Sequence, residues 1–235
     1  MLRCGTHLLE TALQSHSDVA CYGEVFNPYS RIHGYPVDRP TVAEVIEHCR
    51  TQTLATGFLA HAFVGLAAEE TGPGLDLAYR AQPVVRAARG LWQAIPPSTP
   101  VITLRRHNLL ARYVSERVAR RHSVWCVRKG ERMPDPERLA LDCDDMLLDF
   151  ARTAGLMEIA AGRFPGALAV HYEELVAEPE ATFDRVLLHL GVAPRRLIPG
   201  TLKVGRALAD TISNFDEVRT RLLGTRFAAF LEMPT

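Results

Sequence analysis

The 235-residue sequence lacks an excess of charge of either sign, because 27 basic side chains balance 27 acidic ones. A protein that holds nucleic acid mainly through phosphate contacts carries a basic excess, so this balance argues against nucleic acid as a partner. No apolar run reaches the roughly 18 residues of a membrane-spanning helix, and no basic-then-apolar leader opens the chain. We therefore expect a cytoplasmic protein without a membrane span.

Cysteine is scarce, with five residues and no Cys-x-x-Cys pair. An odd number without regular spacing does not form a disulfide framework, and we expect free thiols in a reducing compartment. No set of cysteine and histidine residues has the spacing of metal ligands, so no metal site is predicted. The chain also lacks a Gly-x-x-x-x-Gly-Lys-Ser/Thr run, which counts against a P-loop enzyme such as a small-molecule kinase.

Short apolar runs alternate with helical patterns along the chain. Hydrophobic residues make up 47% of it and charged residues 23%, as in an ordinary globular domain. The runs predict buried strands over 18–22, 56–63, 100–104, 123–127 and 166–172. Helical spacing predicts helices after Gly5, Thr41 and Pro179, and others over 80–94, 109–121, 137–161 and 216–223. Strands separated by helices indicate an α/β fold with a mostly parallel sheet covered on both faces.

The segment Arg3–Leu9 predicts a tight turn that opens a helix. Gly5 permits a left-handed backbone, and Thr6 can offer its hydroxyl to the free N–H groups of the first turn. Such N–H groups beside Arg3 suit an anion, phosphate best of all. An ordinary Thr-capped helix with a surface arginine explains the same residues. Because only Met1 and Leu2 precede the turn, we expect the strand that usually leads into a phosphate-binding turn to be truncated or absent.

A second candidate anion site follows the clearest predicted strand, 100–104. Arg105 and Arg106 come directly after it, and Ser115 lies about two turns into the next helix. A guanidinium fork together with a hydroxyl can hold a phosphate group. A surface arginine cluster, and a serine bonded to its own helix backbone, are the alternatives for these residues.

Three segments together resemble the sulfotransferases that use 3′-phosphoadenosine-5′-phosphosulfate (PAPS). Arg3–Leu9 is similar to that family's 5′-phosphosulfate loop, and Leu104–Asn108 with Ser115 is similar to its 3′-phosphate motif. The run 170–175 resembles the family's Tyr-Glu-x-Leu strand and helix, and the tail 203–224 is similar to the bacterial carbohydrate and lipopolysaccharide type. The resemblance implies one sulfotransferase-like domain over 1–235, with a three-layer, P-loop-NTPase-like sandwich around a central, mostly parallel sheet.

The resemblance also implies the co-substrate and the residues that bind it. PAPS would be the donor, with no metal, and a hydroxyl of a carbohydrate, lipid or secondary metabolite would accept the sulfuryl group. Two anionic groups on the donor require two anion sites. The family motifs favour Arg106 over Arg105 for the 3′-phosphate. The implied donor-binding residues are Arg3, Cys4, Gly5, Thr6, His7, Leu8, Arg105, Arg106 and Ser115.

Glu24 and His7 are the two candidates for the base that activates the acceptor hydroxyl. Glu24 follows Gly23 at the end of a predicted strand, where α/β sheets place their ligand crevice. His7 lies beside the 5′ loop and is either a rival base or a stabiliser of charge. A structural glutamate and a histidine bonded to backbone are the ordinary explanations. Many family members carry a lysine in the front loop where this chain has Arg3, so the group that stabilises the leaving phosphate stays open.

Two other functions stay open from the sequence. One is a kinase-like enzyme that binds phosphate, and the other is an inactive sulfotransferase-fold module that binds a partner. The acceptor, whether a small molecule, a glycan or a lipid, is not specified by any motif. Whether the chain acts alone or as a homodimer is equally open.

Overall fold

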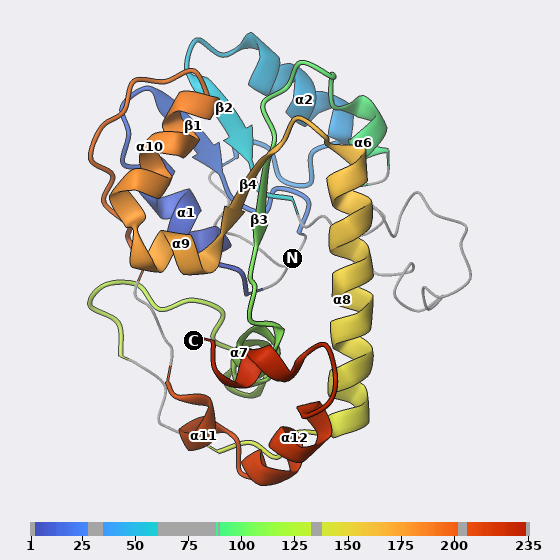
Figure 1. Ribbon diagram of the computed structural model, residues 1–235. Coiled ribbons are helices and arrows are strands. Elements are labelled where there is room, and N and C mark those ends of the chain that lie inside the picture. Colours follow the sequence, from blue (N-terminus) through green and yellow to red (C-terminus); the bar gives the residue numbers. More distant parts are fainter. Residues whose placement is uncertain are drawn as a thin grey trace.

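A computed structural model gives the architecture of the chain (Figure 1). The structure describes residues 3–27, 35–60, 88, 90–132, 138–201 and 206–233. Met1 and Leu2, most of the helix predicted over 80–94 and the end of the strand predicted over 56–63 lie outside these ranges.

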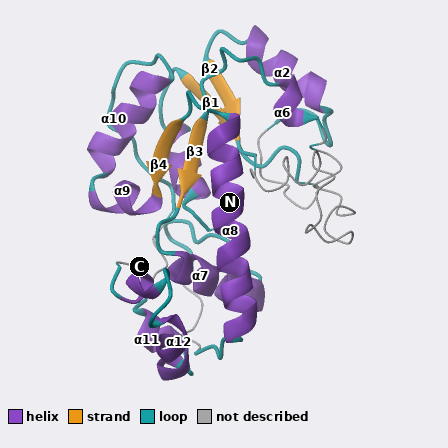
Figure 2. Cartoon of the chain, turned by 45° about the vertical axis from the view of Figure 1, so that its right-hand side comes forward, coloured by secondary structure: helices purple, strands orange, loops and turns teal. Residues whose placement is uncertain are grey.

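The described strands are four, and all of them pair in parallel. They are β1 (Val19–Tyr22), β2 (Ala55–Phe58), β3 (Ile102–Arg105) and β4 (Leu168–His171). Strand β1 pairs with β2, and β3 pairs with β4. The two pairs lie next to each other in the upper part of the molecule, and the lower part of the described chain is helix and loop (Figure 2). The predicted α/β class with parallel strands is thereby confirmed.

The helices of the described residues surround the strands and build the lower part. Their bounds are α1 (Thr6–Leu13), α2 (Val42–Thr51), α6 (Leu91–Ala94), α7 (Leu109–His122), α8 (Cys143–Arg163), α9 (Tyr172–Ala177), α10 (Pro179–His189), α11 (Leu208–Thr211), α12 (Phe215–Leu222) and the 3₁₀ helix η1 (Ala228–Leu231). Helix α8 runs along both parts, and β3 and β4 lie between it and α1, α9 and α10 (Figure 1). Among the helices described, none is long and apolar enough to cross a membrane.

Three groups of buried side chains hold these elements together. The first joins α7, α8, α11 and α12 around Phe150 and Met146. The second packs α1, α9 and α10 against β1 and β4 around Val170 and Leu187. The third lies between α2, α6 and the segment after β1, around Val45. The site described below lies where α1 of the second group meets α7 of the first.

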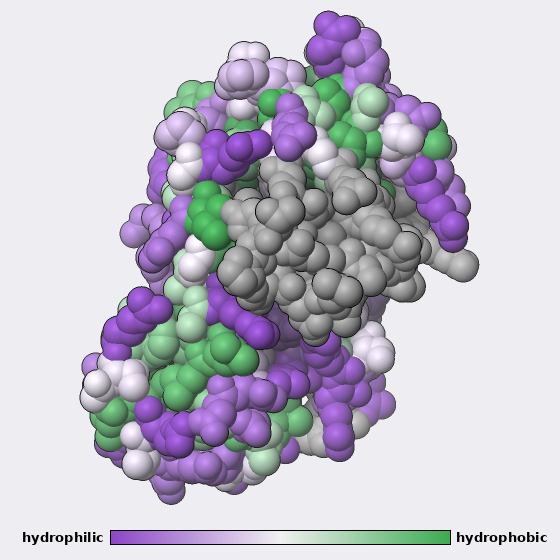
Figure 3. Space-filling view, turned by 90° about the vertical axis from the view of Figure 1, so that its right-hand side faces the viewer, coloured by the Kyte–Doolittle hydropathy of each residue, from purple (hydrophilic) through white to green (hydrophobic). Residues whose placement is uncertain are grey.

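Hydrophobic residues also reach the surface. On the face that Figure 3 draws, they gather in the upper and lower parts of the molecule, each group bordered by hydrophilic residues. Apolar atoms contribute much of the accessible surface of any folded protein, so this pattern alone marks no function.

Helix α8 begins later than the predicted start at residue 137. Asp142 caps it by accepting the backbone N–H groups of Asp144 at 2.9 Å and Asp145 at 3.0 Å. Before the cap the chain is extended, because Leu139 donates its N–H to the carbonyl of Thr211 at 2.8 Å. Pairing with the tail therefore competes with helix formation over 138–142.

The prediction of a strand over 123–127 is wrong. Ser123 ends α7 with a left-handed φ of 54°, and the segment after it is irregular. Trp125 remains 41% exposed, whereas Val127 is buried. The bridge nearest to this segment is antiparallel and joins Arg128 to Thr201. Because this apolar run begins directly at the end of a helix, it packs against its surroundings and does not join the sheet.

Candidate functional site

The turn before α1 has two residues with left-handed backbone. Arg3 has a φ of 62° and Gly5 a φ of 89°. A Cβ atom on Gly5 would lie only 2.7 Å from Cδ2 of Tyr172, so glycine is required both by conformation and by space. A non-glycine residue with positive φ stores strain, and such residues cluster at functional sites.

The N-cap of α1 is Gly5, and Thr6 is the first helical residue. The predicted Thr cap is therefore not formed, because Thr6 lies one position too late to be the N-cap. Gly5 has no side chain that could cover the N–H groups of the first turn. These groups, with the positive end of the helix dipole, suit an anion.

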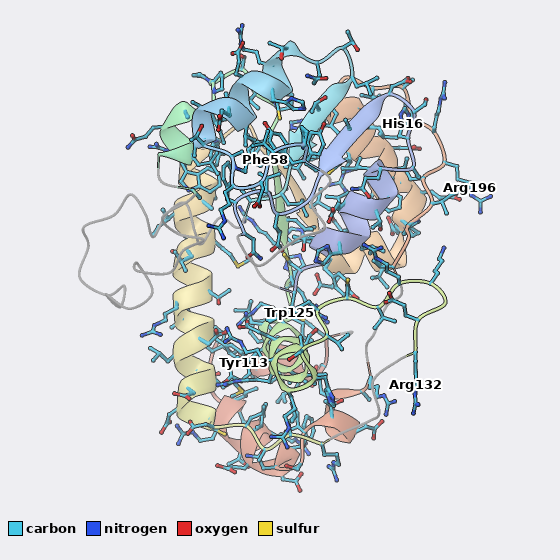
Figure 4. The ribbon with its side chains drawn as sticks, turned by 180° about the vertical axis from the view of Figure 1, so that it is seen from behind. His16, Phe58, Tyr113, Trp125, Arg132 and Arg196 are labelled. Atoms are coloured by element: carbon cyan, nitrogen blue, oxygen red, sulfur yellow. The ribbon has the colours of Figure 1, made fainter. Side chains whose placement is uncertain are left out.

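The two predicted anion-binding clusters meet in the structure. Arg3 donates from Nε to Oγ of Ser115 at 3.0 Å, although the residues are 112 positions apart. Arg106 donates from Nη1 to the backbone carbonyl of Arg3 at 3.4 Å, across 103 positions. Arg3 also donates to the carbonyl of Trp125, and Figure 4 shows Trp125 at α7, toward the upper part of the molecule.

Arg106 is a buried cation with an unused donor. Its residue is 6% exposed, and its guanidinium lies over the ring of Tyr172 with Cζ 4.4 Å from the ring centre. Within the described part of the chain, the buried Nε of Arg106 has no hydrogen-bond partner. Burial lowers the pKa of both Arg106 and Arg3, and the charge of Arg3 lowers that of Arg106 further. Both still carry their charge at neutral pH. A buried cation with an unused donor, beside the partly buried cation of Arg3, fits an anionic ligand.

A carboxylate from α9 already binds the start of α7. Glu173 accepts the backbone N–H groups of His107 and Asn108, both at 3.1 Å. Asn108 also caps α7 by accepting the N–H of Ala111 at 2.9 Å. An anion at this end of the site would therefore be held by side chains and not by the α7 backbone.

Arg105 lies apart from Arg106. It ends β3, opposite His171 of β4, and successive residues of a strand direct their side chains to opposite faces. Burial lowers the pKa of His171, and the neighbouring His107 and Arg105 act in the same direction. The ring of His107 stacks on that of His171, with their centres 3.7 Å apart. The structure thus brings Arg106 to Arg3, and Arg3 in turn contacts Ser115.

Cys4 and Leu8 contribute packing to the turn. Cys4 is fully buried, and Leu8 packs against the core group formed by α1, α9 and α10. Any contact of these two residues with an anion would come from their backbone N–H groups.

Glu24 and His7 lie close enough to interact. The carboxylate of Glu24 accepts from Nδ2 of Asn27 at 2.7 Å, in the segment after β1. His7 contacts a carboxylate of its own helix, because its Nδ1 lies 2.9 Å from Oε2 of Glu10. This hydrogen bond raises the pKa of His7, burial lowers it, and the charges of Glu10 and Glu24 raise it again.

Glu10 was not predicted as part of the site. Helical periodicity places it on the polar side of α1, yet only 4% of it is exposed. The signal that the sequence does contain is the spacing of three from His7 to Glu10, which makes the two side chains neighbours on a helix.

Comparison with models of protein families matches residues 1–195 to the sulfotransferase family. No curated protein and no solved structure shows a match. The matched range contains Arg3, Glu24, Arg106 and Ser115. Among the described residues, no group of three or more His, Cys, Asp or Glu side chains is placed to hold a metal ion.

Proposed function

The chain belongs to the sulfotransferase family, and from this premise we propose that it moves a sulfuryl group from PAPS to a hydroxyl of a carbohydrate, a lipid or another secondary metabolite. The observation that carries the proposal is the junction of Arg3, Arg106 and Ser115. Two stretches more than a hundred residues apart meet there, as a donor with two separate anionic groups requires.

The two anionic ends of the donor have separate ligands in this proposal. The uncapped N–H groups at the start of α1, within the Arg3–Leu8 segment, hold the 5′-phosphosulfate. Arg106 and Ser115 hold the 3′-phosphate, and Arg3 lies between the two groups. The unused Nε of Arg106 supports this assignment, because a buried donor without a partner is costly unless a ligand completes it.

PAPS supplies the activated sulfuryl group. In an in-line transfer, the acceptor oxygen bonds to sulfur while the bond from sulfur to the 5′-phosphate oxygen breaks, and the phosphate keeps the electron pair. Glu24 takes the proton of the acceptor hydroxyl as general base. His7 is better suited to stabilising negative charge than to being the base, because its raised pKa favours the protonated imidazole.

The finer features of the proposal come from the resemblance in the sequence. We place the chain in the bacterial carbohydrate and lipopolysaccharide branch of the family, acting in the cytoplasm without a metal. We also propose that 1–235 form one domain with the three-layer, P-loop-NTPase-like sandwich. The two parallel strand pairs are compatible with that architecture.

Binding of adenosine 3′,5′-bisphosphate, the product of PAPS, tests the proposal. The ligand should raise the melting temperature, with about 2.7 kcal/mol of added stability at a concentration about 100 times its Kd. Arg106→Ala should weaken binding about tenfold or more, because a charge-assisted contact is lost. Arg50→Ala is the matched control, since Arg50 is exposed and pairs with Glu47 on α2.

Two outcomes would count against the proposal. Absence of any shift at millimolar bisphosphate would overturn it, and a shift produced by ATP alone would indicate a kinase-like enzyme. If Arg106→Ala leaves the affinity unchanged, the 3′-phosphate role passes to Arg105 or to another group.

A further inference from the structure

We propose that Glu10 is a positioning residue, which holds the imidazole of His7 as a cation at the start of α1, where it stabilises the anionic end of the donor. This inference rests on the proposed function and deepens it. It assigns a role to a buried carboxylate that the transfer mechanism above does not use.

The first observation is the burial of Glu10. Its side chain is 5% exposed and lies 2.9 Å from Nδ1 of His7. A buried carboxylate is costly unless a charge or several donors compensate it. Its other oxygen accepts from Nε2 of Gln14 at 3.4 Å, and Gln14 is itself fixed by the carbonyl of Cys21 at 2.8 Å. The carboxylate is therefore oriented from two sides.

The second observation is the set of charges that surround His7. Glu10 lies on the same helix, Glu24 lies in the segment after β1, and Arg3 lies in the turn before α1. The hydrogen bond to Glu10 raises the pKa of His7, and Glu24 adds to the rise. Burial and Arg3 oppose it, and the outcome is a raised pKa. Because a carboxylate only accepts, Nδ1 is the donor to Glu10, and Nε2 carries the second proton of the imidazolium.

The third observation is the position of the pair beside the uncapped start of α1. An unpaired Glu10 would place a buried negative charge one helical turn from the N–H groups that suit an anion. With His7 protonated, the pair is neutral, and the N-terminal end of α1 keeps its positive potential. When His7 loses its proton, the pair becomes negative and repels the donor. Donor affinity should therefore fall as the pH rises through the pKa of His7.

Calorimetric titration with adenosine 3′,5′-bisphosphate tests this inference. It is repeated from about pH 6 to about pH 9, a range that includes the ordinary pKa of histidine. The wild-type affinity should fall about tenfold as His7 deprotonates. In Glu10→Gln the fall should begin at lower pH, because the carboxylate no longer favours the imidazolium. In His7→Lys the fall in affinity should be absent, because the lysine amine stays charged over this range. The pH profile of His7→Lys also contains the effect of the ligand's own ionisation on binding.

Ring-proton NMR of His7 in the free protein gives a readout that does not depend on the ligand. The midpoint of His7 should move to lower pH in Glu10→Gln. Glu47→Gln is the matched control, since Glu47 is exposed and pairs with Arg50 on α2, and it should move neither midpoint nor affinity. If Glu10→Gln does not fold, the inference is tested by comparing the pH dependence of bisphosphate affinity in the wild type and in His7→Lys.

An unchanged His7 midpoint in Glu10→Gln would overturn the inference. So would a loss of affinity at high pH in His7→Lys as large as that of the wild type. Either result leaves the proposed function standing, because bisphosphate still binds. If the wild type binds no bisphosphate at any pH, the proposed function fails, and the role of the pair in donor binding fails with it.

Discussion

Glu24 is the single residue on which the proposed chemistry depends most. Glu24 is partly buried and is separated from the end of β1 by Gly23, and its carboxylate accepts from Asn27 at 2.7 Å. Its charge also raises the pKa of His7. In the proposed mechanism this carboxylate takes the proton of the acceptor hydroxyl, and it is not among the proposed ligands of the donor phosphates.

Glu24→Gln should therefore lower turnover, and it should leave donor binding unaffected while His7 is protonated. We expect turnover to fall about 10² to 10⁴-fold, the usual contribution of a general base, with a bisphosphate affinity close to that of the wild type at about pH 6, below the ordinary pKa of histidine. Release of bisphosphate from PAPS in the presence of hydroxyl acceptors measures the first quantity, and calorimetry the second. Retained turnover would transfer the role of base to His7.

Some residues of the candidate site were predictable from the sequence, and others were not. Arg3, Arg106 and Ser115 lie in motifs, so their meeting was predictable, and the structure brings them together. Glu10 was not predictable by the same route, because periodicity assigns a charged residue on the polar side of a helix to solvent. Its burial depends on Gln14 and His7 acting together, which no single-residue pattern contains.

At the scale of elements, the turn that opens α1 depends on close packing against α9. Gly5 lies at φ 89°, and a Cβ atom there would meet Tyr172, the first residue of α9. The same Tyr172 ring lies under the guanidinium of Arg106. One tyrosine thus holds both the turn and the buried arginine.

Gly5→Ala should destabilise the protein and weaken bisphosphate binding. The left-handed backbone costs about 1–2 kcal/mol for a non-glycine residue, and displacement of Tyr172 adds to it. Gly155→Ala in α8 is the control, because a Cβ there meets nothing within 4 Å, and it should stabilise by about 0.5–1 kcal/mol. Chemical unfolding measures both, and equal effects would contradict the role of the turn.

Most element types were predictable from the sequence, and their ends were less so. The periodicity that predicts 109–121 agrees with α7 at Leu109–His122. The start of α8 was not predictable, because residues 138–142 pair with the tail near Thr211. A strand over 123–127 fails for a related reason, since strand formation depends on whether the sheet has an edge within reach.

At the scale of the whole molecule, one core group joins the elements of the lower part to the helix that carries Ser115. Phe150 of α8 is fully buried and contacts the rings of Tyr113, Phe227 and Phe230. Tyr113 lies on α7, two residues before Ser115. The packing of the lower part therefore determines where Ser115, one residue of the proposed donor site, lies.

Phe150→Ala should cost about 3–5 kcal/mol of unfolding free energy, as expected for a large buried aromatic residue. Leu148→Ala is the control from the same helix, because Leu148 is 49% exposed, and it should change stability by about 0.5 kcal/mol or less. Urea unfolding measures both. A loss for Phe150→Ala no greater than that of the control would show that this core group contributes little.

The sequence alone predicted the α/β class but could not predict the arrangement of the strands. Alternation of strands and helices depends on local pattern, and it holds over β1 to β4. The separation into β1–β2 and β3–β4 pairs depends on which backbones meet after folding, and short apolar runs carry no information about their neighbours.

The carboxylate that Glu173 places on the backbone amides of His107 and Asn108 has a consequence for selectivity. A helix start left open would attract any small anion, including inorganic phosphate. With Glu173 seated there, one of two neighbouring helix ends repels stray anions while the other stays available. Of these two helix ends, only that of α1 offers backbone N–H groups to a ligand, and a second anionic group has to be held by the arginine side chains.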